Sequence, residues 1–333
     1  MALPRVYLIG TGGTISFVAQ SRTDFVDYTY NTRNLSIEEM LARIPEAAAL
    51  AEVRPEQLVN VASTDVGPDE WLGLANRVNA IFRDDPLAAG VAITHGTASL
   101  EETAYFLNLT VKSDKPVVVT GAMRPPSSIS TDADLNLLDA IRVAASPAAR
   151  GMGVLVVMNN EIQAARDVAK SDSLRVQTMT SRALGLLGYA DSDGGVAFFR
   201  APIRKHTRET DFVVETFKTL PRVDIVPAYA GGDGLVIRAL VDAGVAGIVA
   251  AGMGSGSGPS KFLQALDDAV KRGVKVVVAT YSPDGRVLMK KRFIDGGYIV
   301  ADNLTPKKAR ILLMLGLAHG GDANRIQQWV WRY

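Results

Sequence analysis

Short, continuous apolar runs alternate with segments of helical periodicity along the first half of the chain. Each run is rich in β-branched residues and is apolar on both faces, which is typical of strands covered on both sides of a sheet. Strands are predicted at residues 6–9, 91–94, 116–120 and 153–158, and helices at 100–107 and 135–145. This alternation predicts an α/β fold with a mainly parallel, doubly wound sheet.

The alternation lapses between residues 201 and 222, where a polar, charged stretch is closed by Pro221. A second, smaller α/β unit follows. Its predicted strands are 223–228, 247–253 and 274–280, and its predicted helices are 235–243, 261–272 and 306–319. We therefore expect an N-terminal catalytic α/β domain over residues 1–203, a linker over 204–222 and a smaller C-terminal α/β domain over 223–333.

Charge and hydropathy narrow the classes of function. The 333 residues include 36 basic and 35 acidic ones, for a net charge of +1, and there is no basic run or basic-aromatic stripe, so nucleic acid is not expected as a partner. No apolar stretch reaches the length of about 18 residues needed to span a membrane. The first predicted strand begins at residue 6, so we expect no signal peptide before it. These features predict a cytoplasmic protein, or a periplasmic one if a leader has been removed.

Reactive side chains are few. Cysteine is absent, and the histidines are His95, His206 and His319. The absence of cysteine excludes disulfides, thiolate metal sites and a cysteine nucleophile. Three histidines give little support to a serine–histidine pair or a zinc site. We therefore expect no metal site, and we expect His95 to be a structural, hydrogen-bonded residue.

Three loops that follow predicted strands carry hydroxyl and charged side chains, at residues 10–14, 94–99 and 166–170. Open α/β sheets bind their ligands at the carboxyl ends of the strands, so Thr14, Thr97 and Lys170 are expected to converge there. Such a set supports acyl transfer, in which a threonine attacks a carbonyl and a lysine made less basic by burial takes the proton. Backbone N–H groups of the glycine turn around Gly13 would stabilise the oxyanion.

Other interpretations of these loops remain open. The first loop has glycines at 10, 12 and 13, as in phosphate-binding turns, but Ile15 stands where a dinucleotide-binding loop has its third glycine, and no Walker Gly-Lys-Ser/Thr follows. Thr14 and Thr97 would also suit the caps of the helices that follow them. Lys170 would suit a solvated surface position.

A set of motifs is spread over the whole chain, at residues 11–15, 93–97, 101–106, 110–118, 121–125, 204–207, 308–312 and the closing Tyr333. Together they resemble the bacterial L-asparaginase/glutaminase family. The resemblance implies the two-domain fold of that family, with the larger domain first, and an amidohydrolase that needs no cofactor. It also implies a homotetramer built as a dimer of intimate dimers, with active sites at subunit interfaces and a small-molecule amide as substrate.

The resemblance assigns roles to several residues. Thr14 matches the threonine nucleophile, which forms an acyl-enzyme. Thr97 and Lys170 match a second pair formed by a hydroxyl and a lysine. The family also uses a tyrosine on a mobile loop after the first threonine, and Tyr28 or Tyr30 would fill that place; an ungapped alignment favours Tyr30.

The substrate-binding positions both match and depart from the family pattern. Ser63 matches the serine that holds the substrate carboxylate. The family's aspartate that pairs with the substrate α-ammonium is Ala98 here, and its glutamine after the serine is Thr64. The asparagine contributed by a neighbouring subunit corresponds to Ser255 or Ser257.

These departures predict a changed substrate. A buried ammonium left without its charged partner costs about 3–5 kcal/mol, so we expect an acyl group without a free α-ammonium. The substrate would then be an amide, a cyclic amide, an ester or a lactone. The first alternative is a genuine L-asparaginase whose α-amino site is rebuilt from residues such as Asp284 or Asp295. The second is a ligand-binding protein of the same fold without activity, which the retained Thr14, Thr97 and Lys170 argue against.

Overall fold

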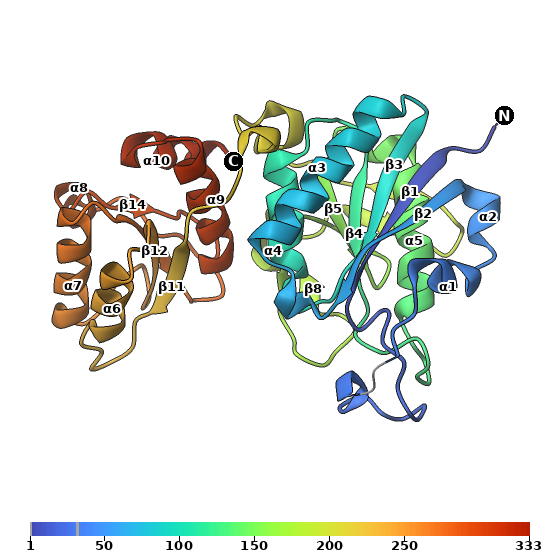
Figure 1. Ribbon diagram of the computed structural model, residues 1–333, viewed down its shortest axis with the longest axis horizontal. Helices are drawn as coiled ribbons and strands as arrows, with labels where there is room; N and C mark the ends of the chain where they lie inside the picture. The colour runs from blue at the N-terminus through green and yellow to red at the C-terminus, as the bar shows by residue number, and fades with distance from the viewer. Residues whose placement is uncertain (1, 31–32) are drawn as a thin grey trace. The chain divides into compact units, whose positions relative to one another are not determined.

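The structure is a computed structural model that describes residues 2–30 and 33–333, with the side chain of Tyr30 also outside the description. The chain divides into two compact units, residues 1–210 and 211–333. Each unit is built on its own sheet and has its own hydrophobic core (Figure 1).

Unit 1 is built on an eight-stranded sheet. Its strands are β1 (Arg5–Gly12), β2 (Glu52–Val61), β3 (Ala88–Thr94), β4 (Val117–Thr120), β5 (Val154–Met158), β6 (Glu161–Ala164), β9 (Gly188–Ala190) and β10 (Val196–Phe198). They lie in the order β10-β9-β6-β5-β4-β3-β1-β2, and the five strands from β5 to β2 are parallel. The predicted mainly parallel sheet is confirmed, with an antiparallel flank of β6, β9 and β10 that was not predicted.

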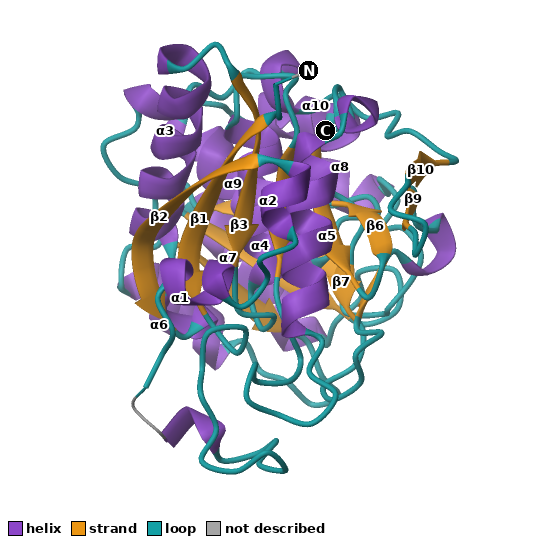
Figure 2. Cartoon of the chain, turned by 90° about the vertical axis from the view of Figure 1, so that its right-hand side faces the viewer, coloured by secondary structure: helices purple, strands orange, loops and turns teal. Residues whose placement is uncertain are grey.

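Helices cover both faces of this sheet. The helices α3 (Pro68–Asp84) and α4 (Leu100–Thr110) lie on one face, and α1 (Ile37–Ala42), α2 (Ala47–Leu50) and α5 (Ala133–Ala145) lie on the other (Figures 1 and 2). The predicted helices at 100–107 and 135–145 are α4 and α5, each a few residues longer than expected.

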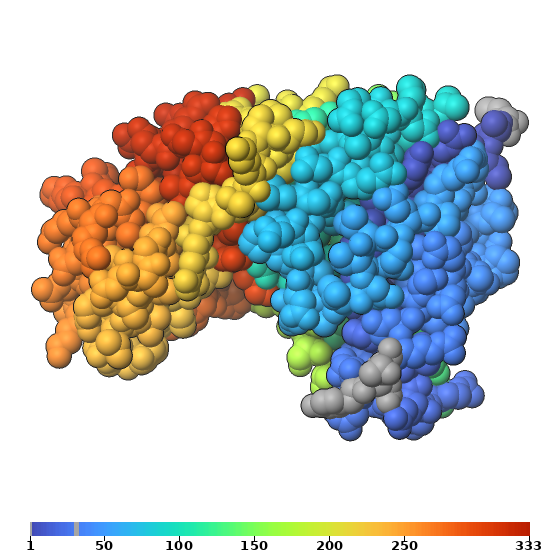
Figure 3. Space-filling model, in the orientation of Figure 1, coloured from blue at the N-terminus to red at the C-terminus, as the bar shows by residue number. Residues whose placement is uncertain are grey.

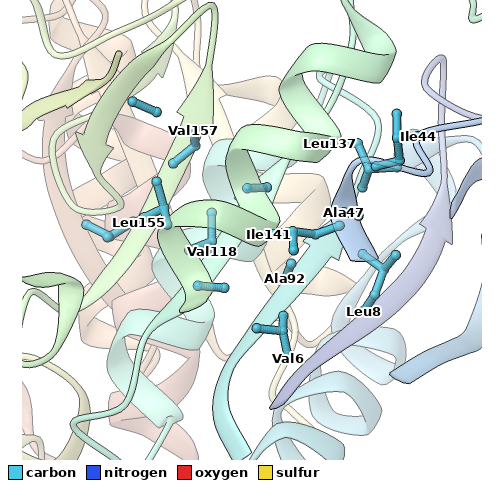
Figure 4. Close-up of a cluster of buried hydrophobic side chains, with 14 of the residues drawn as sticks. Val6, Leu8, Ile44, Ala47, Ala92, Val118, Leu137, Ile141, Leu155 and Val157 are labelled. Carbon is cyan, nitrogen blue, oxygen red and sulfur yellow. The ribbon is translucent and has the colours of Figure 1, made fainter. Parts of the chain in front are cut away.

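The packing of the sheet against α5 explains why the strand sequences are continuous apolar runs. Val6 and Leu8 of β1 and Val118 of β4 point towards Leu137 and Ile141 of α5, and all five side chains are at most 1% exposed (Figure 4). Ile9 of β1 and Val117 and Val119 of β4, which alternate with these residues, are also at most 1% exposed. A strand that is buried on both faces has no polar face to show in its sequence.

The strand order creates a crevice at one point of the sheet. From β1 the chain passes to β2 on one side, and β3 returns to the other side of β1, which gives the order 2-1-3-4-5 for the parallel strands. Helical connections therefore leave in opposite directions at β1 and β3. Open α/β sheets bind ligands outside the carboxyl ends of the strands at such a point, so the sheet alone places the candidate loops after β1 and β3.

Unit 2 has a four-stranded parallel sheet in chain order, with β11 (Val223–Pro227), β12 (Gly247–Gly252), β13 (Lys275–Thr280) and β14 (Ile299–Val300). Helices α6 (Leu235–Asp242) and α7 (Ser260–Lys271) share one core with the sheet, while α9 (Pro306–Ala318) packs against β11, β12 and β13, and α10 (Ala323–Arg332) packs on α9. The short helix α8 (Lys291–Asp295) precedes β14. The strands and helices predicted in this part of the chain match these bounds within about one residue.

Across the described residues, none of the helices combines the length and the apolar character that a bilayer-crossing segment requires.

Candidate active site

A cavity of about 690 Å³ opens in unit 1 at the carboxyl ends of β1 and β3. Its lining combines glycine backbone, hydroxyl groups, two cationic side chains and several apolar side chains. The described lining residues are Gly13, Thr14, Phe17, Phe25, Val26, Tyr28, Thr29, Ala62, Ser63, Thr64, Gly96, Thr97, Ala98, Met123, Arg124, Lys170, Ser173 and Leu174. The cavity thus contains every site residue predicted in unit 1 apart from Tyr30, whose side chain lies outside the described part of the chain.

The loops that form the cavity touch through glycines. A methyl group added to Gly13 would lie 2.2 Å from the Cα atom of Gly96, and one added to Gly96 would lie 2.8 Å from the Oγ atom of Ser63. Gly13 also has a φ angle of +89°, which disfavours any other residue. The loops after β1, β2 and β3 therefore meet at distances that side chains would prevent.

The structure corrects the expected role of the Gly13 N–H group. This N–H donates to the carbonyl oxygen of Val61 at 3.0 Å, in continuation of the pairing between β1 and β2. It is therefore engaged within the sheet, and Gly13 serves the site through its close packing against Gly96.

Thr14 follows β1 and pairs with a tyrosine. Its Oγ1 atom lies 2.9 Å from the hydroxyl oxygen of Tyr28, and either group can be the donor. Tyr28 opens a short 3-10 helix, Tyr28–Tyr30, in a loop that projects from the body of unit 1 (Figure 3), and its ring packs on Phe17 with centroids 6.2 Å apart. Of the two tyrosines expected near Thr14, Tyr28 is in contact with it, and the side chain of Tyr30 lies outside the described part of the chain. Since no helix begins at Thr14, the capping interpretation does not hold there.

Thr97 pairs with Lys170. The Lys170 Nζ atom donates to Thr97 Oγ1 at 2.8 Å, and the Thr97 hydroxyl donates to the Met123 Sδ atom at 3.4 Å. Thr97 is 5% exposed, and the N-cap of α4 is Ser99 and not Thr97. The Thr97 hydroxyl therefore faces the cavity and does not cap the helix.

Lys170 reaches the site by a different route from the one expected. The chain leaves β5 through Asn159 and Asn160, both with positive φ angles of 53° and 62°, and reverses into β6. Two such residues make the tight turn that joins antiparallel strands. Lys170 then comes from a small two-stranded ribbon, β7 (Ala169–Lys170) and β8 (Met179–Thr180), rather than directly from the end of a parallel strand.

Asp132 fixes the turn that carries Met123 and Arg124. Its two carboxylate oxygens accept the backbone N–H groups of Met123 at 3.0 Å and of Arg124 at 2.9 Å. The side chain of Asn136 donates to the same carboxylate at 3.1 Å and to the carbonyl oxygen of Gly121 at 2.9 Å. The beginning of α5 thus holds this turn against Thr97. Sequence reasoning assigned no function to Met123 or Arg124, although both stand in a motif that carried the resemblance.

His95 lies behind the cavity and is held as a neutral ring. Its Nδ1 atom contacts the Gly96 carbonyl oxygen at 2.8 Å, so Nδ1 carries the hydrogen, and Nε2 accepts from the Thr103 hydroxyl at 2.8 Å. Thr103 in turn accepts from Nε1 of Trp71 at 2.9 Å. Complete burial lowers the pKa of His95 to about 4. His95 is therefore a structural group that shapes the loop next to Thr97.

The described lining of the cavity contains the cations Arg124 and Lys170 and no aspartate or glutamate. Ala98 is exposed to the cavity, as is Thr64, while Ser63 is 6% exposed. Nowhere in the described part of the chain do three or more acidic or histidine side chains gather as a metal site would require. The remaining predicted residue, Ser257, lies in unit 2, in the turn after β12, where its backbone pairs with Met253.

Two threonine hydroxyls, each with a polar partner, face one cavity at the switch point of an α/β sheet. This arrangement and the fold define a hydrolase that acts on the carbon–nitrogen bond of an amide. The model of the N-terminal asparaginase domain matches residues 5–204, and the model of the glutaminase/asparaginase C-terminal domain matches residues 222–330. The chain belongs to the asparaginase family.

Relatives from several bacteria match over nearly the full length. L-asparaginase 2 of Bacillus subtilis is 41% identical over 99% of this chain and 87% of its own. The glutaminase-asparaginase of Pseudomonas fluorescens biotype A is 40% identical over 99% and 91%. A crystal structure of a probable cytoplasmic L-asparaginase from Campylobacter jejuni superimposes with a TM-score of 0.94, at 39% identity and 99% coverage of both chains. The predicted two-domain fold of the asparaginase type is confirmed.

Proposed function

We propose that this chain hydrolyses a carboxamide to a carboxylic acid and ammonia, with a threonine hydroxyl as nucleophile. The observation that carries the proposal is the pairing of Thr97 with Lys170, at 2.8 Å, in the same cavity as the pairing of Thr14 with Tyr28, at 2.9 Å. A nucleophile next to a group that can take its proton is the arrangement that covalent catalysis requires.

In this mechanism the Thr14 oxygen attacks the carbonyl carbon of the amide, and its proton leaves through the contact with Tyr28. The C–N bond breaks, the nitrogen takes up a proton and ammonia leaves, so that the acyl group is an ester of Thr14. The amine form of Lys170, acting through the Thr97 hydroxyl, then takes a proton from water. The resulting hydroxide attacks the ester and releases the acid and the Thr14 hydroxyl.

Two observations bear on the acyl group. The relatives are L-asparaginases and glutaminase-asparaginases, which favours L-asparagine as the substrate over our expectation from the sequence. The second candidate is an amide without a free α-ammonium, such as succinamate or an N-acyl asparagine. It is favoured by the charge of the cavity, where the described lining offers Arg124 and Lys170 to an anion and no carboxylate to an ammonium.

The discriminating experiment measures ammonia release from L-asparagine, L-glutamine, N-acetyl-L-asparagine and succinamate, with the variant Thr14→Val as control. Activity on at least one amide that is lost in the control supports the hydrolase. A kcat/KM for L-asparagine at least as high as for the two substrates without an ammonium supports a genuine asparaginase. The reverse order supports the changed substrate, and Ala98→Asp should then shift the preference back towards L-asparagine. Failure to hydrolyse any of the four amides would contradict the proposal.

We further propose that the chain forms a homotetramer and that a neighbouring subunit completes each cavity with the turn that carries Ser257. Light scattering of the purified chain tests the assembly. Ser257→Ala should raise KM in the tetramer, whereas an unchanged KM would remove Ser257 from the site. As for compartment, the relatives include a probable cytoplasmic enzyme and one named periplasmic, and we propose the cytoplasm, or the periplasm after removal of a leader.

A further inference from the structure

Met123 places a thioether against the hydroxyl of a candidate catalytic threonine. Its Sδ atom accepts the hydrogen bond from Thr97 Oγ1 at 3.4 Å, and the side chain lines the cavity and is half-buried. In contrast, Met40, Met158, Met179 and Met314 are at most 4% exposed. Met123 is therefore a methionine that both touches the site and is open to a small solute in the cavity.

The directions of the hydrogen bonds at Thr97 show that the Met123 sulfur accepts the Thr97 hydrogen. The Lys170 ammonium can only donate, so the Thr97 oxygen accepts from it and the Thr97 hydrogen must point elsewhere. It points to the thioether, which is a weak acceptor. The hydroxyl is thus directed without being held strongly, and it can turn its hydrogen to another acceptor during the reaction.

The backbone of Met123 cannot shift to relieve a change at its sulfur. Asp132 accepts both the Met123 and the Arg124 N–H groups, and Asn136, which is 2% exposed, holds that carboxylate from α5. A change in the chemistry of the sulfur is therefore transmitted to Thr97 and not absorbed by movement of the turn.

We propose that Met123 is a peroxide-sensitive modification site, and that its oxidation to the sulfoxide reversibly suppresses the activity of the Thr97–Lys170 pair. The oxidant is hydrogen peroxide or a small alkyl hydroperoxide. A sulfur lone pair attacks the OH oxygen of the peroxide and the O–O bond breaks. The departing hydroxide or alkoxide takes the hydrogen from the oxygen now bound to sulfur and leaves as water or alcohol. Sulfur is oxidised by two electrons and the peroxide is reduced by two. Methionine sulfoxide reductases restore the thioether.

The sulfoxide oxygen changes the acceptor that Thr97 faces. It is a strong hydrogen-bond acceptor in place of a weak one, and it holds the Thr97 hydrogen away from Lys170. A gain of one ordinary hydrogen bond in the resting state corresponds to a fall in kcat of about tenfold. Met123 acts here as a positioning residue for Thr97, so kcat should fall while KM stays close to its starting value.

The experiment treats the purified full-length chain with hydrogen peroxide and follows ammonia release and the mass of each methionine-containing peptide. The chain is compared with Met123→Leu and with the control Met152→Leu, which alters a half-buried methionine of unit 1 that is not among the described lining residues. Each protein is compared with its own untreated rate. We expect about a tenfold loss of kcat in the wild type and in Met152→Leu, in step with the sulfoxide at residue 123, and recovery with reductases MsrA and MsrB. Met123→Leu should keep its rate.

An equal loss in Met123→Leu would overturn the proposal, as would full activity in a wild type that carries the sulfoxide, or a Met123 that oxidises no faster than Met158. The activity measurement rests on the proposed function, so a second readout does not use the reaction. Peroxide treatment should lower Tm by about 2 °C more in Thr97→Val than in the wild type, because only the wild type gains the new hydrogen bond. Equal drops would contradict the inferred contact even if no amide were hydrolysed.

Discussion

The contact between Lys170 and Thr97 allows the role of the lysine to be tested in depth. Lys170→Met keeps most of the length and apolar bulk of the side chain but removes the amine that donates to Thr97 Oγ1 at 2.8 Å. If Lys170 moves protons, kcat on the best amide substrate should fall by about 10²–10⁴-fold, which corresponds to about 3–5 kcal/mol of transition-state free energy. KM should change little, because the threonine hydroxyls and Ser63 remain.

Folding should be nearly unaffected by the same change. Lys170 is half-buried at the end of a two-residue strand, so the loss of its hydrogen bond should cost about 1 kcal/mol of unfolding free energy. Urea unfolding of Lys170→Met should therefore stay close to that of the wild type. A large loss of stability would mean that the fall in kcat reports a damaged fold and not a missing base.

The variant Lys170→Arg separates proton transfer from simple charge. Arginine keeps the positive charge and the donor, but it does not give up its proton in proteins. If Lys170 is a base, Lys170→Arg should be as inactive as Lys170→Met, and the acid limb of the pH profile should disappear from both. Recovery to within about threefold of the wild type in Lys170→Arg would refute the reasoning, since charge alone would then be sufficient.

Three further outcomes follow from described contacts. Tyr28→Phe removes the hydroxyl that contacts Thr14, and ammonia release should show kcat reduced by about 10²-fold, whereas an unchanged kcat would remove Tyr28 from the reaction. Gly96→Ala forces a methyl group to 2.8 Å from Ser63 Oγ, so urea titration should show the free energy of unfolding reduced by about 1–3 kcal/mol. The control Gly73→Ala lies in α3 with nothing within 4 Å of the added methyl group, and it should raise the free energy of unfolding by up to about 1 kcal/mol. Burial lowers the pKa of His95 to about 4, below its value in the unfolded chain, so protons bind the unfolded state more tightly and stability is lost as the pH falls from about 6.5 towards 4. Between pH 7 and pH 5 the wild type should lose about 2 kcal/mol relative to His95→Gln in denaturant titrations, and parallel pH curves for the two proteins would show that His95 titrates normally.

Strands buried on both faces could be predicted from the sequence, and strands with one polar side could not. The runs that became β3, β4 and β5 were predicted to within a few residues because nothing polar interrupts them. In contrast, β2 lies at the end of the sheet order, and every one of its residues is half-buried or exposed. The strand is not recognised as an apolar run because its first half is mostly polar or charged, with Glu52, Arg54, Pro55 and Glu56. The antiparallel strands β6, β9 and β10 are too short to show an alternation of apolar and polar residues.

The site residues also divide into those that the sequence pattern could place and those that it could not. Thr14 and Thr97 could be placed because each directly follows a parallel strand and the carboxyl ends of parallel strands share one edge. Lys170 was placed with them, but the Asn159–Asn160 turn that reverses the chain before it was not recognised, although paired asparagines between apolar runs are a signal for such a turn. Tyr28 lies in a single 3-10 turn and Met123 in an irregular loop, and both segments are too short for a periodicity to indicate which way a side chain points.

The detour of the chain through β6 before Lys170 has an evolutionary consequence. Thr14 and Thr97 are positioned by the ends of the central strands β1 and β3. Lys170 and Tyr28 instead lie in long excursions of the chain outside the main sheet, in the β7–β8 ribbon and in the loop after β1. Sequence change within those excursions can retune proton affinity and access to the carbonyl while the strands and their packing stay as they are. Libraries restricted to the exposed positions within residues 17–29 and 169–177 would therefore sample new specificities at little risk to folding.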